Sequence, residues 1–245
     1  MHLGLLLQQT TEIRHPPFDG PANHTRAVFH ALRGLGHTVR LVARSDDGIW
    51  ASDDLQTFRR LSVPKADRGW FRLFERSVRR GQRMLRLPYA NLFDSRRFAL
   101  AACQELAEAD VLYERMSWMG WGGGWASARL RRPLVVEYNG DPLLDLEAKG
   151  MAPVGVQRRL SLGLMRRSLG HAAHVVASGD GWRRQFIERW AFDPQRVTAI
   201  ENGSSLVERL QRRDLRSFNG TEKSVGPVRV VYLGGFQPWQ GVSIL

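Results

Sequence analysis

The sequence predicts an α/β protein built on a doubly wound parallel (Rossmann-like) sheet. Its composition, 43% hydrophobic and 24% charged residues, is ordinary for a globular chain. Short apolar runs typical of buried parallel strands alternate with segments of helical periodicity. The first strand, helix and strand fit in about 40 residues, the length expected for a parallel βαβ unit. In such a sheet, ligands bind at the carboxyl ends of the strands.

Each element follows from its own local pattern. The apolar runs predict six strands, at residues 3–7, 38–43, 111–113, 134–138, 173–177 and 197–200. Helical spacing predicts helices at residues 23–35, 125–130, 156–169 and 181–190. Asn23 is the expected N-cap of the first helix and Gly36 its expected C-terminal stop. Cys103 lies in a further helical apolar pattern, where we expect a buried structural thiol.

The length of 245 residues corresponds to about one and a half domains. We expect a first domain at residues 1–203 and a polar linker at residues 204–227, which contains the turn signals Asn219-Gly220 and Gly226-Pro227. Residues 228–245 then give one further strand and loop. A parallel strand needs neighbouring strands and covering helices, so these residues are interpreted as the beginning of a second domain that is truncated here.

The charge is strongly basic, with a formal net value of +12. Within residues 68–97, a stripe of arginines at spacings of 4, 3, 4 and 3 runs beside Phe71, Phe74, Val78 and Leu85; it consists of Arg72, Arg76, Arg79, Arg83 and Arg86. Three interpretations stay open: a helix lying on anionic lipid headgroups, a solvated helix packed on the sheet, and a nucleic-acid contact favoured by charge alone.

Several chemistries lack their sequence signatures. There is no P-loop, no dinucleotide-binding G-x-G-x-x-G after the first strand, and no H-E-x-x-H. The glycine-rich segment at residues 120–125 follows the wrong strand for a phosphate loop. His171 and His174 are interpreted as surface or capping groups, so we expect no metal site and no cofactor. One cysteine, and a start without a basic export signal, lead us to expect a cytoplasmic protein, with the inner membrane face as a second location.

Five motifs in order resemble a known family. They are PPFDG at residues 16–20 with LGHTV at 35–39, ADVLYER at 109–115, AHVVAS at 173–178, PQRVTAIENG at 194–203 and LGGFQPWQG at 233–241. Together they resemble the amino-terminal half of a retaining glycosyltransferase of family 4 with the GT-B architecture, followed by the start of its donor domain. The resemblance spans most of the chain, although each motif is weak alone.

The resemblance implies donor- or acceptor-binding residues at Gly20, Asn139, Glu147, Asn202, Gly203 and Gly234. A glycine such as Gly20 lets backbone N–H groups approach a diphosphate or sugar closely, although it also suits a plain turn. Asn139 stands where the family often has a sugar-contacting histidine; an amide can hydrogen-bond a hydroxyl but does not titrate near neutrality. Asn139 equally fits a turn, and Asn202 with Gly203 either line the cleft or form a turn.

The function implied by the resemblance is transfer of a sugar from a nucleoside-diphosphate sugar to a glycan or lipid-linked acceptor, with no obligatory metal. The family's main donor-binding residues lie in the carboxyl-terminal half, which we expect to be missing here, and the catalytic residues stay unassigned. We therefore expect weak donor binding and little turnover by this chain alone. The alternatives are a non-catalytic subunit that completes a glycosyltransferase in trans, and a basic nucleic-acid-binding protein.

Overall fold

The computed structural model describes residues 1–63, 69–84, 92–148 and 150–203. The chain divides into two compact units, Met1–Ile200 and Glu201–Leu245. Of the second unit only residues 201–203 are described, so the expected linker at 204–227 and the expected strand and loop at 228–245 lie outside the described residues. The helices and strands of the described residues all lie in the first unit.

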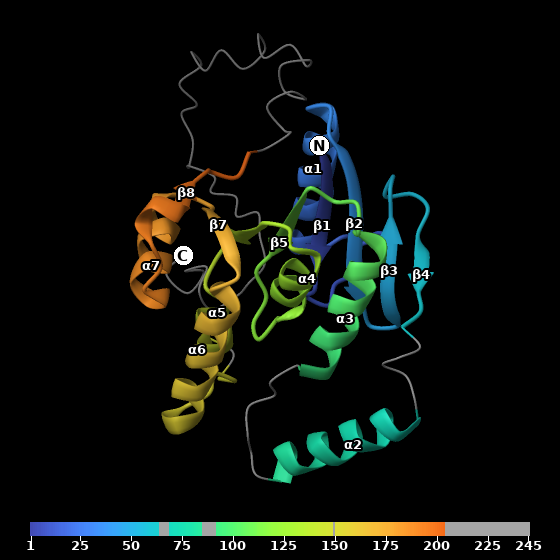
Figure 1. The fold of residues 1–245 in the computed structure, drawn as a ribbon. Coiled ribbons are helices and arrows are strands. Elements are labelled where there is room, and N and C mark those ends of the chain that lie inside the picture. The colour runs from blue at the N-terminus through green and yellow to red at the C-terminus, as the bar shows by residue number, and fades with distance from the viewer. Residues whose placement is uncertain (64–68, 85–91, 149, 204–245) are drawn as a thin grey trace, which may run out of the picture. The chain divides into compact units, whose positions relative to one another are not determined.

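The first unit is built on one eight-stranded sheet, drawn in Figure 1. Its strands are β1 (His2–Leu7), β2 (Thr38–Ser45), β3 (Gly48–Ser52), β4 (Arg59–Leu61), β5 (Val111–Arg115), β6 (Leu134–Tyr138), β7 (Ala172–Ala177) and β8 (Val197–Ala199). Their order is β4-β3-β2-β1-β5-β6-β7-β8. Strands β1, β2 and β5 to β8 are parallel, whereas β3 and β4 are antiparallel to their neighbours.

All six predicted strands are present, and the doubly wound α/β fold is confirmed. The antiparallel strands β3 and β4 are additions that the sequence patterns did not predict. A two-residue turn, Asp46-Asp47, joins β2 to β3, since Ser45 pairs with Gly48 across it. The sheet thus has an antiparallel edge on an otherwise parallel arrangement, which is common in doubly wound folds.

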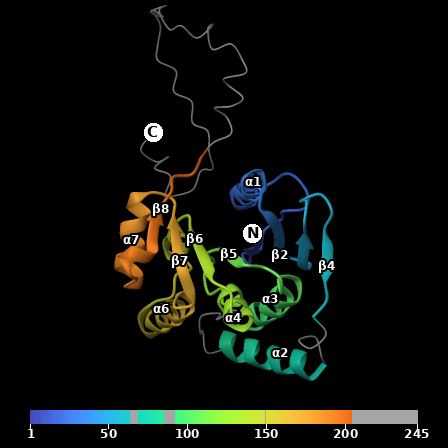
Figure 2. The same cartoon turned by 45° about the horizontal axis from the view of Figure 1, so that its top comes forward.

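Eight helices accompany the sheet in the described residues. They are α1 (Gly20–Gly34), α2 (Gly69–Met84), α3 (Leu92–Glu105), α4 (Gly122–Leu130), α5 (Pro142–Ala148), α6 (Gly155–Leu169), α7 (Asp180–Trp190) and the short 3₁₀ helix η2 (Pro194–Arg196). Figure 2 shows α1 on one side of the sheet and α3, α4 and α6 on the other, with α2 outside α3. The four predicted helices correspond to α1, α4, α6 and α7.

The two faces of the sheet have separate apolar cores. On the α1 face, odd-numbered strand residues such as Leu5 and Leu41 pack against Phe29 of α1. On the opposite face, Leu6 and Leu112 pack in the core that contains Phe98 of α3. This alternation is what a strand buried on both faces requires, and it explains why β1 is an unbroken apolar run.

The start of α1 differs from the prediction. The N-cap is Asp19 rather than Asn23: its Oδ1 accepts a hydrogen bond from the backbone N–H of Ala22 at 2.8 Å. Asn23 instead lies inside the helix and donates to the carbonyl of Phe18 at 3.0 Å. The helix begins earlier because Pro21 is compatible with a first helical turn, where its missing N–H has no partner to lose.

Helix α2 is held to α3 by a charge cluster. Glu75 of α2 accepts hydrogen bonds from Arg79 and from Arg97 of α3, and Arg79 also contacts Asp94 at 3.2 Å. Asp94 in turn pairs with Arg44 of β2 at 2.9 Å. Burial alone would raise the pKa of Glu75, but the two arginines outweigh it and hold that pKa below its ordinary value.

Candidate functional site

The winding of the sheet reverses beside β1. This strand pairs with β2 on one side and with β5 on the other, so the loops that leave β1 and β5 diverge at their carboxyl ends. A crevice of about 240 Å³ lies there. It is lined by Gln8, Gln9, Thr10, Arg44, Met116, Ser117, Trp118, Pro142, Asp145 and Leu146. This is the place where open α/β sheets bind ligands.

The glycine-rich segment beside the crevice forms the first turn of α4. The amide oxygen of Gln8 accepts from the backbone N–H of Gly122 at 2.7 Å, and Glu114 accepts from that of Gly123 at 3.3 Å. Gln8 also donates to Ser95 of α3 at 2.6 Å. These helix N–H groups already have partners within the protein, so the segment serves to seat α4 and is not a phosphate loop.

Glu114 is a buried carboxyl group in this arrangement. Burial raises its pKa to about 8, although the hydrogen bond from Gly123 acts in the opposite direction. The group therefore carries its proton at neutral pH. A Cβ atom on Gly123 would lie 2.2 Å from a Glu114 carboxyl oxygen, which explains why a glycine occupies this position.

A second polar cluster lies on the α1 face at the same edge and is centred on Glu137, at the carboxyl end of β6. The hydroxyl of Tyr113 donates to Glu137 at 2.8 Å, the amide of Asn139 also donates to it, and Arg115 lies 3.7 Å away. His24 of α1 places Nε2 2.7 Å from a Glu137 carboxylate oxygen. Three separate segments thus supply polar groups to one buried carboxylate, as such burial requires.

Tyr113 is a fixed donor in this Glu137 cluster, which comprises His24, Tyr113, Arg115, Glu137 and Asn139. Burial, and next the neighbouring Glu137 carboxylate, raise the pKa of Tyr113 above its ordinary value. Its hydroxyl therefore keeps its proton and donates to the carboxylate at neutral pH.

Asp141 marks the turn from β6 into α5. Its Oδ1 accepts from the backbone N–H of Leu143 at 2.9 Å, and Oδ2 lies 2.7 Å from Nε of Arg189. Burial raises the pKa of Asp141 above its ordinary value, whereas Leu143 and Arg189 act to lower it. The contact joins the loop after β6 to α7, so it fixes the backbone that carries Asn139.

The sequence-predicted site residues fall in different places. Gly20 is exposed at the first position of α1, where a Cβ atom would meet nothing within 4 Å, and Asn139 belongs to the Glu137 cluster. Glu147 does not join them; it pairs with Arg158 of α6 at 2.5 Å. Asn202 and Gly203 are exposed and belong to the second unit, and Gly234 lies outside the described residues.

Sequence reasoning missed His24 and Glu137. Glu137 is a charged residue within an otherwise apolar strand, which is a signal for a polar partner. His24 is four residues after Gly20 and so lies on the same side of α1. Both residues can be singled out in the sequence, but the contact between them depends on how α1 lies over β5 and β6.

The structure divides the predicted arginine stripe. Arg76 is exposed, whereas Arg79 faces α3 in ion pairs with Glu75 and Asp94. Arg86 and the side chains of Arg72 and Arg83 lie outside what the structure describes.

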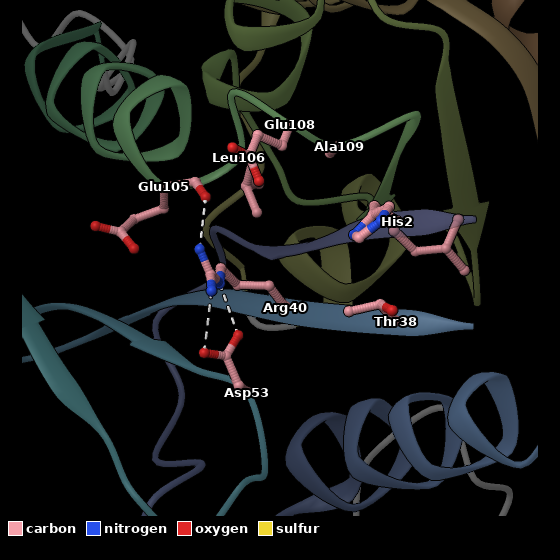
Figure 3. Close-up of a pocket in the computed structure, with 9 residues that line it drawn as sticks. His2, Thr38, Arg40, Asp53, Glu105, Leu106, Glu108 and Ala109 are labelled. Carbon is pink, nitrogen blue, oxygen red and sulfur yellow. Dashed lines mark hydrogen bonds and ion pairs between the residues drawn. The ribbon is translucent and has the colours of Figure 1, made fainter. Parts of the chain in front are cut away.

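Another pocket, shown in Figure 3, lies at the amino ends of β1 and β2, where His2 and Thr38 begin these strands. It encloses about 70 Å³. Arg40 spans it, with Nε 2.6 Å from Asp53 and Nη1 donating to the carbonyl of Glu105 at 3.2 Å. This volume is less than a third of that of the crevice, and the Arg40–Asp53 ion pair closes it, so the pocket is a small structural gap.

The described residues contain neither a metal cluster nor a membrane-spanning helix. Across residues 1–63, 69–84, 92–148 and 150–203, no group of three or more His, Cys, Asp or Glu side chains is arranged to hold a metal ion. None of the helices in these segments has the length and apolar character needed to cross a bilayer.

The family of the chain follows from a match that covers most of the first unit. The model of the glycosyl transferase 4-like domain matches residues 19–203, and the chain therefore belongs to this family of glycosyltransferase-like enzymes. The match begins at the N-cap of α1 and extends past β8, so it includes both the Glu137 cluster and the carboxyl ends of β5 to β8.

Solved structures give a more distant likeness. Anabaena HepE in complex with UDP is 15% identical, with a TM-score of 0.44, and the match covers 84% of this chain and 45% of HepE. The same protein with UDP-glucose gives 15% identity, a TM-score of 0.41, and coverage of 89% and 50%. This chain thus spans about half the length of the solved protein that it matches. Among curated proteins, none matches the sequence.

Proposed function

We propose that this protein contributes the acceptor-side domain of a retaining glycosyltransferase, which moves a hexose from a nucleoside-diphosphate sugar to a glycan or lipid-linked acceptor. The observation that carries the proposal is the family match over residues 19–203 on a sheet whose carboxyl edge holds a crevice and a polar cluster. We expect tight donor binding and transfer to require a second α/β domain.

The carboxyl edge supports sugar binding rather than phosphate binding. Most of its polar groups are amides, hydroxyls and carboxyls, such as Gln9, Thr10 and Asn139, which suit sugar hydroxyl groups. The two arginines at this edge already face carboxylates, Arg44 that of Asp94 and Arg115 that of Glu137. The edge therefore favours the sugar, and the cations that a leaving diphosphate needs are expected on the other domain.

Isothermal titration tests this proposal. UDP-glucose, UDP-N-acetylglucosamine and GDP-mannose are titrated into the 245-residue chain, with UDP and GDP as controls. We expect weak binding, in the millimolar range, with little turnover. Micromolar binding with turnover by this chain alone would contradict the need for a second domain, and no binding of any nucleotide sugar would contradict the proposed function.

A partner in trans is the alternative arrangement. Coexpression with a carboxyl-terminal glycosyltransferase half is expected to restore transfer if this chain works as one subunit of two. The DNA downstream of the codon for Leu245 distinguishes the cases, because an open frame for a second α/β domain favours a single longer enzyme and a stop codon favours the partner.

We propose in addition that the outer face of α2 lies on an anionic membrane surface. Three apolar side chains of α2 are exposed: Leu73 (66%), Phe74 (56%) and Met84 (76%). Arg76 and Arg80 are exposed beside them and have no acidic partner among the described residues. Exposed apolar and basic groups on one helix are the pattern of an interfacial helix, with about 1 kcal/mol per basic residue near the lipid surface.

Flotation with anionic liposomes tests the membrane contact. We expect binding at low salt that falls at high salt, and its loss in the variant Leu73→Ser with Phe74→Ser. Arg76→Ala is expected to weaken binding. Glu105→Gln is the control, because Glu105 lies on another surface and pairs with Arg59. Absence of flotation at low salt would end the proposal.

A further inference from the structure

The Glu137 cluster contains the imidazole ring of His24, which contacts the described part of the protein through only one of its two nitrogen atoms. Nε2 of His24 is buried against Glu137, at 2.7 Å from the carboxylate oxygen, and its N–H is not aligned for a regular hydrogen bond. The histidine side chain as a whole is 24% exposed, whereas that of Glu137 is 6% exposed. One side of the ring therefore faces the protein interior and the other reaches the surface.

The carboxylate determines how the ring can act. A histidine nitrogen that faces a carboxylate carries the proton, which leaves the other nitrogen as a hydrogen-bond acceptor in the neutral ring. For His24 this acceptor is Nδ1, which has no hydrogen-bond partner among the described residues. The arrangement is that of an acceptor oriented by a buried carboxylate, with the Tyr113 hydroxyl and Asn139 amide holding the carboxylate itself.

The position of His24 relates it to the carboxyl edge of the sheet. His24 lies one helical turn after Gly20, on the same side of α1, and nothing within 4 Å fills the space beside Gly20. His24 contacts the carboxylate of Glu137, and the same carboxylate accepts a hydrogen bond from Asn139 at the end of β6. An imidazole is thus present at this edge although the strand-end position holds an asparagine.

We propose that His24 is a substrate-contacting residue, whose Nδ1 accepts a hydrogen bond from a carbohydrate hydroxyl and whose ring is oriented by Glu137. The inference rests on the proposed function and names one residue and one type of contact within it. The hydroxyl belongs either to the donor sugar or to the acceptor, and the two sources are separated by the ligands used in the test.

Two variants separate a substrate contact from a structural one. His24→Gln keeps an N–H donor near the position of Nε2, so the Glu137 contact is retained while the Nδ1 acceptor is lost. His24→Asn keeps an acceptor near the position of Nδ1 and loses the Glu137 contact. His30→Gln is the matched control, since His30 is exposed further along α1. All four proteins are first compared by thermal unfolding.

Binding is measured by titration calorimetry and by ¹⁵N-histidine NMR of the whole chain. The ligands are UDP and GDP, the nucleotide sugars UDP-glucose, UDP-N-acetylglucosamine and GDP-mannose, and methyl glycosides of glucose, galactose and mannose. We expect a shift of the His24 Nδ1 resonance with a sugar-bearing ligand and none with a free nucleotide. A shift with nucleotide sugars assigns the donor sugar, and a shift with methyl glycosides alone assigns the acceptor.

For the ligand that binds, His24→Gln is expected to weaken affinity roughly tenfold, the effect of losing about one hydrogen bond. His24→Asn should weaken it less, and His30→Gln should not change it. A greater loss in His24→Asn than in His24→Gln, or wild-type binding without any Nδ1 shift, would overturn the assignment of His24 and leave the proposed function intact. No binding of any sugar-bearing ligand to the wild type would overturn both.

Discussion

The Glu114 carboxyl lies 3.3 Å from the backbone nitrogen of Gly123, so a buried acid caps the first turn of α4. Gln8 caps the preceding residue of the same turn from β1. The helix is therefore fixed to two strands by side chains that accept from its free N–H groups. This seat lies directly beside the crevice at the carboxyl ends of β1 and β5.

Glu114 is expected to make stability depend on pH. Its ordinary pKa is 4.5 and its folded pKa is about 8, so between these values the folded state holds a proton that the unfolded state has lost. The free energy of unfolding should therefore fall as pH rises from 4.5 to 8. In Glu114→Gln this part of the decrease in the free energy of unfolding, on the order of 5 kcal/mol, should be absent. Urea unfolding of both proteins between about pH 5 and pH 9 measures it, and parallel pH curves would contradict it.

Gly123→Ala is expected to destabilise the protein by roughly 2–4 kcal/mol, because the new methyl group would overlap the buried Glu114 carboxyl. Gly163→Ala is the matched control within another helix, where nothing lies within 4 Å of the added Cβ. That control should stabilise the protein by about 0.5–1 kcal/mol. Chemical unfolding compares the free energies of unfolding of the two variants, and equal effects would contradict the close packing of Gly123 against Glu114.

Glu75→Gln is expected to loosen α2 from α3 by roughly 1–2 kcal/mol, because Arg79 and Arg97 would lose their shared carboxylate. The contribution of Glu75, whose pKa is lowered, is present above pH 4.5 and is lost as pH falls through the folded pKa. Hydrogen exchange of the α2 amides measures both effects. The α2 amides of Glu105→Gln should exchange as in the wild type, and unchanged exchange in Glu75→Gln would refute the role of the cluster.

Gly20→Ala is expected to leave stability unchanged and to weaken nucleotide-sugar binding or transfer at least several-fold. The structure has room for the methyl group, so a loss would report a ligand that approaches the helix start closely. Gly34→Ala, at the other end of α1 and equally free of neighbours, should affect neither property. Calorimetry with thermal unfolding separates the outcomes; wild-type binding by Gly20→Ala would show that Gly20 serves only as the first residue of α1.

Much of the fold was predictable because the central strands are continuous apolar runs buried on both faces. Strand β4 escaped prediction because it forms the edge, where Arg59 and Arg60 remain exposed and no apolar run is needed. Strand β3 escaped because it is short and only its last two residues, Ala51 and Ser52, are buried. The predicted N-cap, Asn23, lies too late in the sequence because Pro21 is compatible with a first helical turn, which lets Asp19 cap the helix.

The candidate site was less predictable, for a physical reason. Glu137 gains its partners from β5 and from α1, and these contacts depend on strand register and on the placement of α1 over the sheet. Asn139 was placed at this edge by resemblance, but its neighbours could not be inferred from local pattern. Glu147 was expected near Asn139, yet its carboxylate is turned toward Arg158 on α6.

The close fit of Gly123 over Glu114 couples two positions in evolution. A relative that acquires a side chain at position 123 needs a shorter side chain at position 114, and a relative with a small residue at position 114 has no need of the glycine. The two alignment columns should therefore covary, and the homologues that keep both residues should share the loss of stability toward alkaline pH.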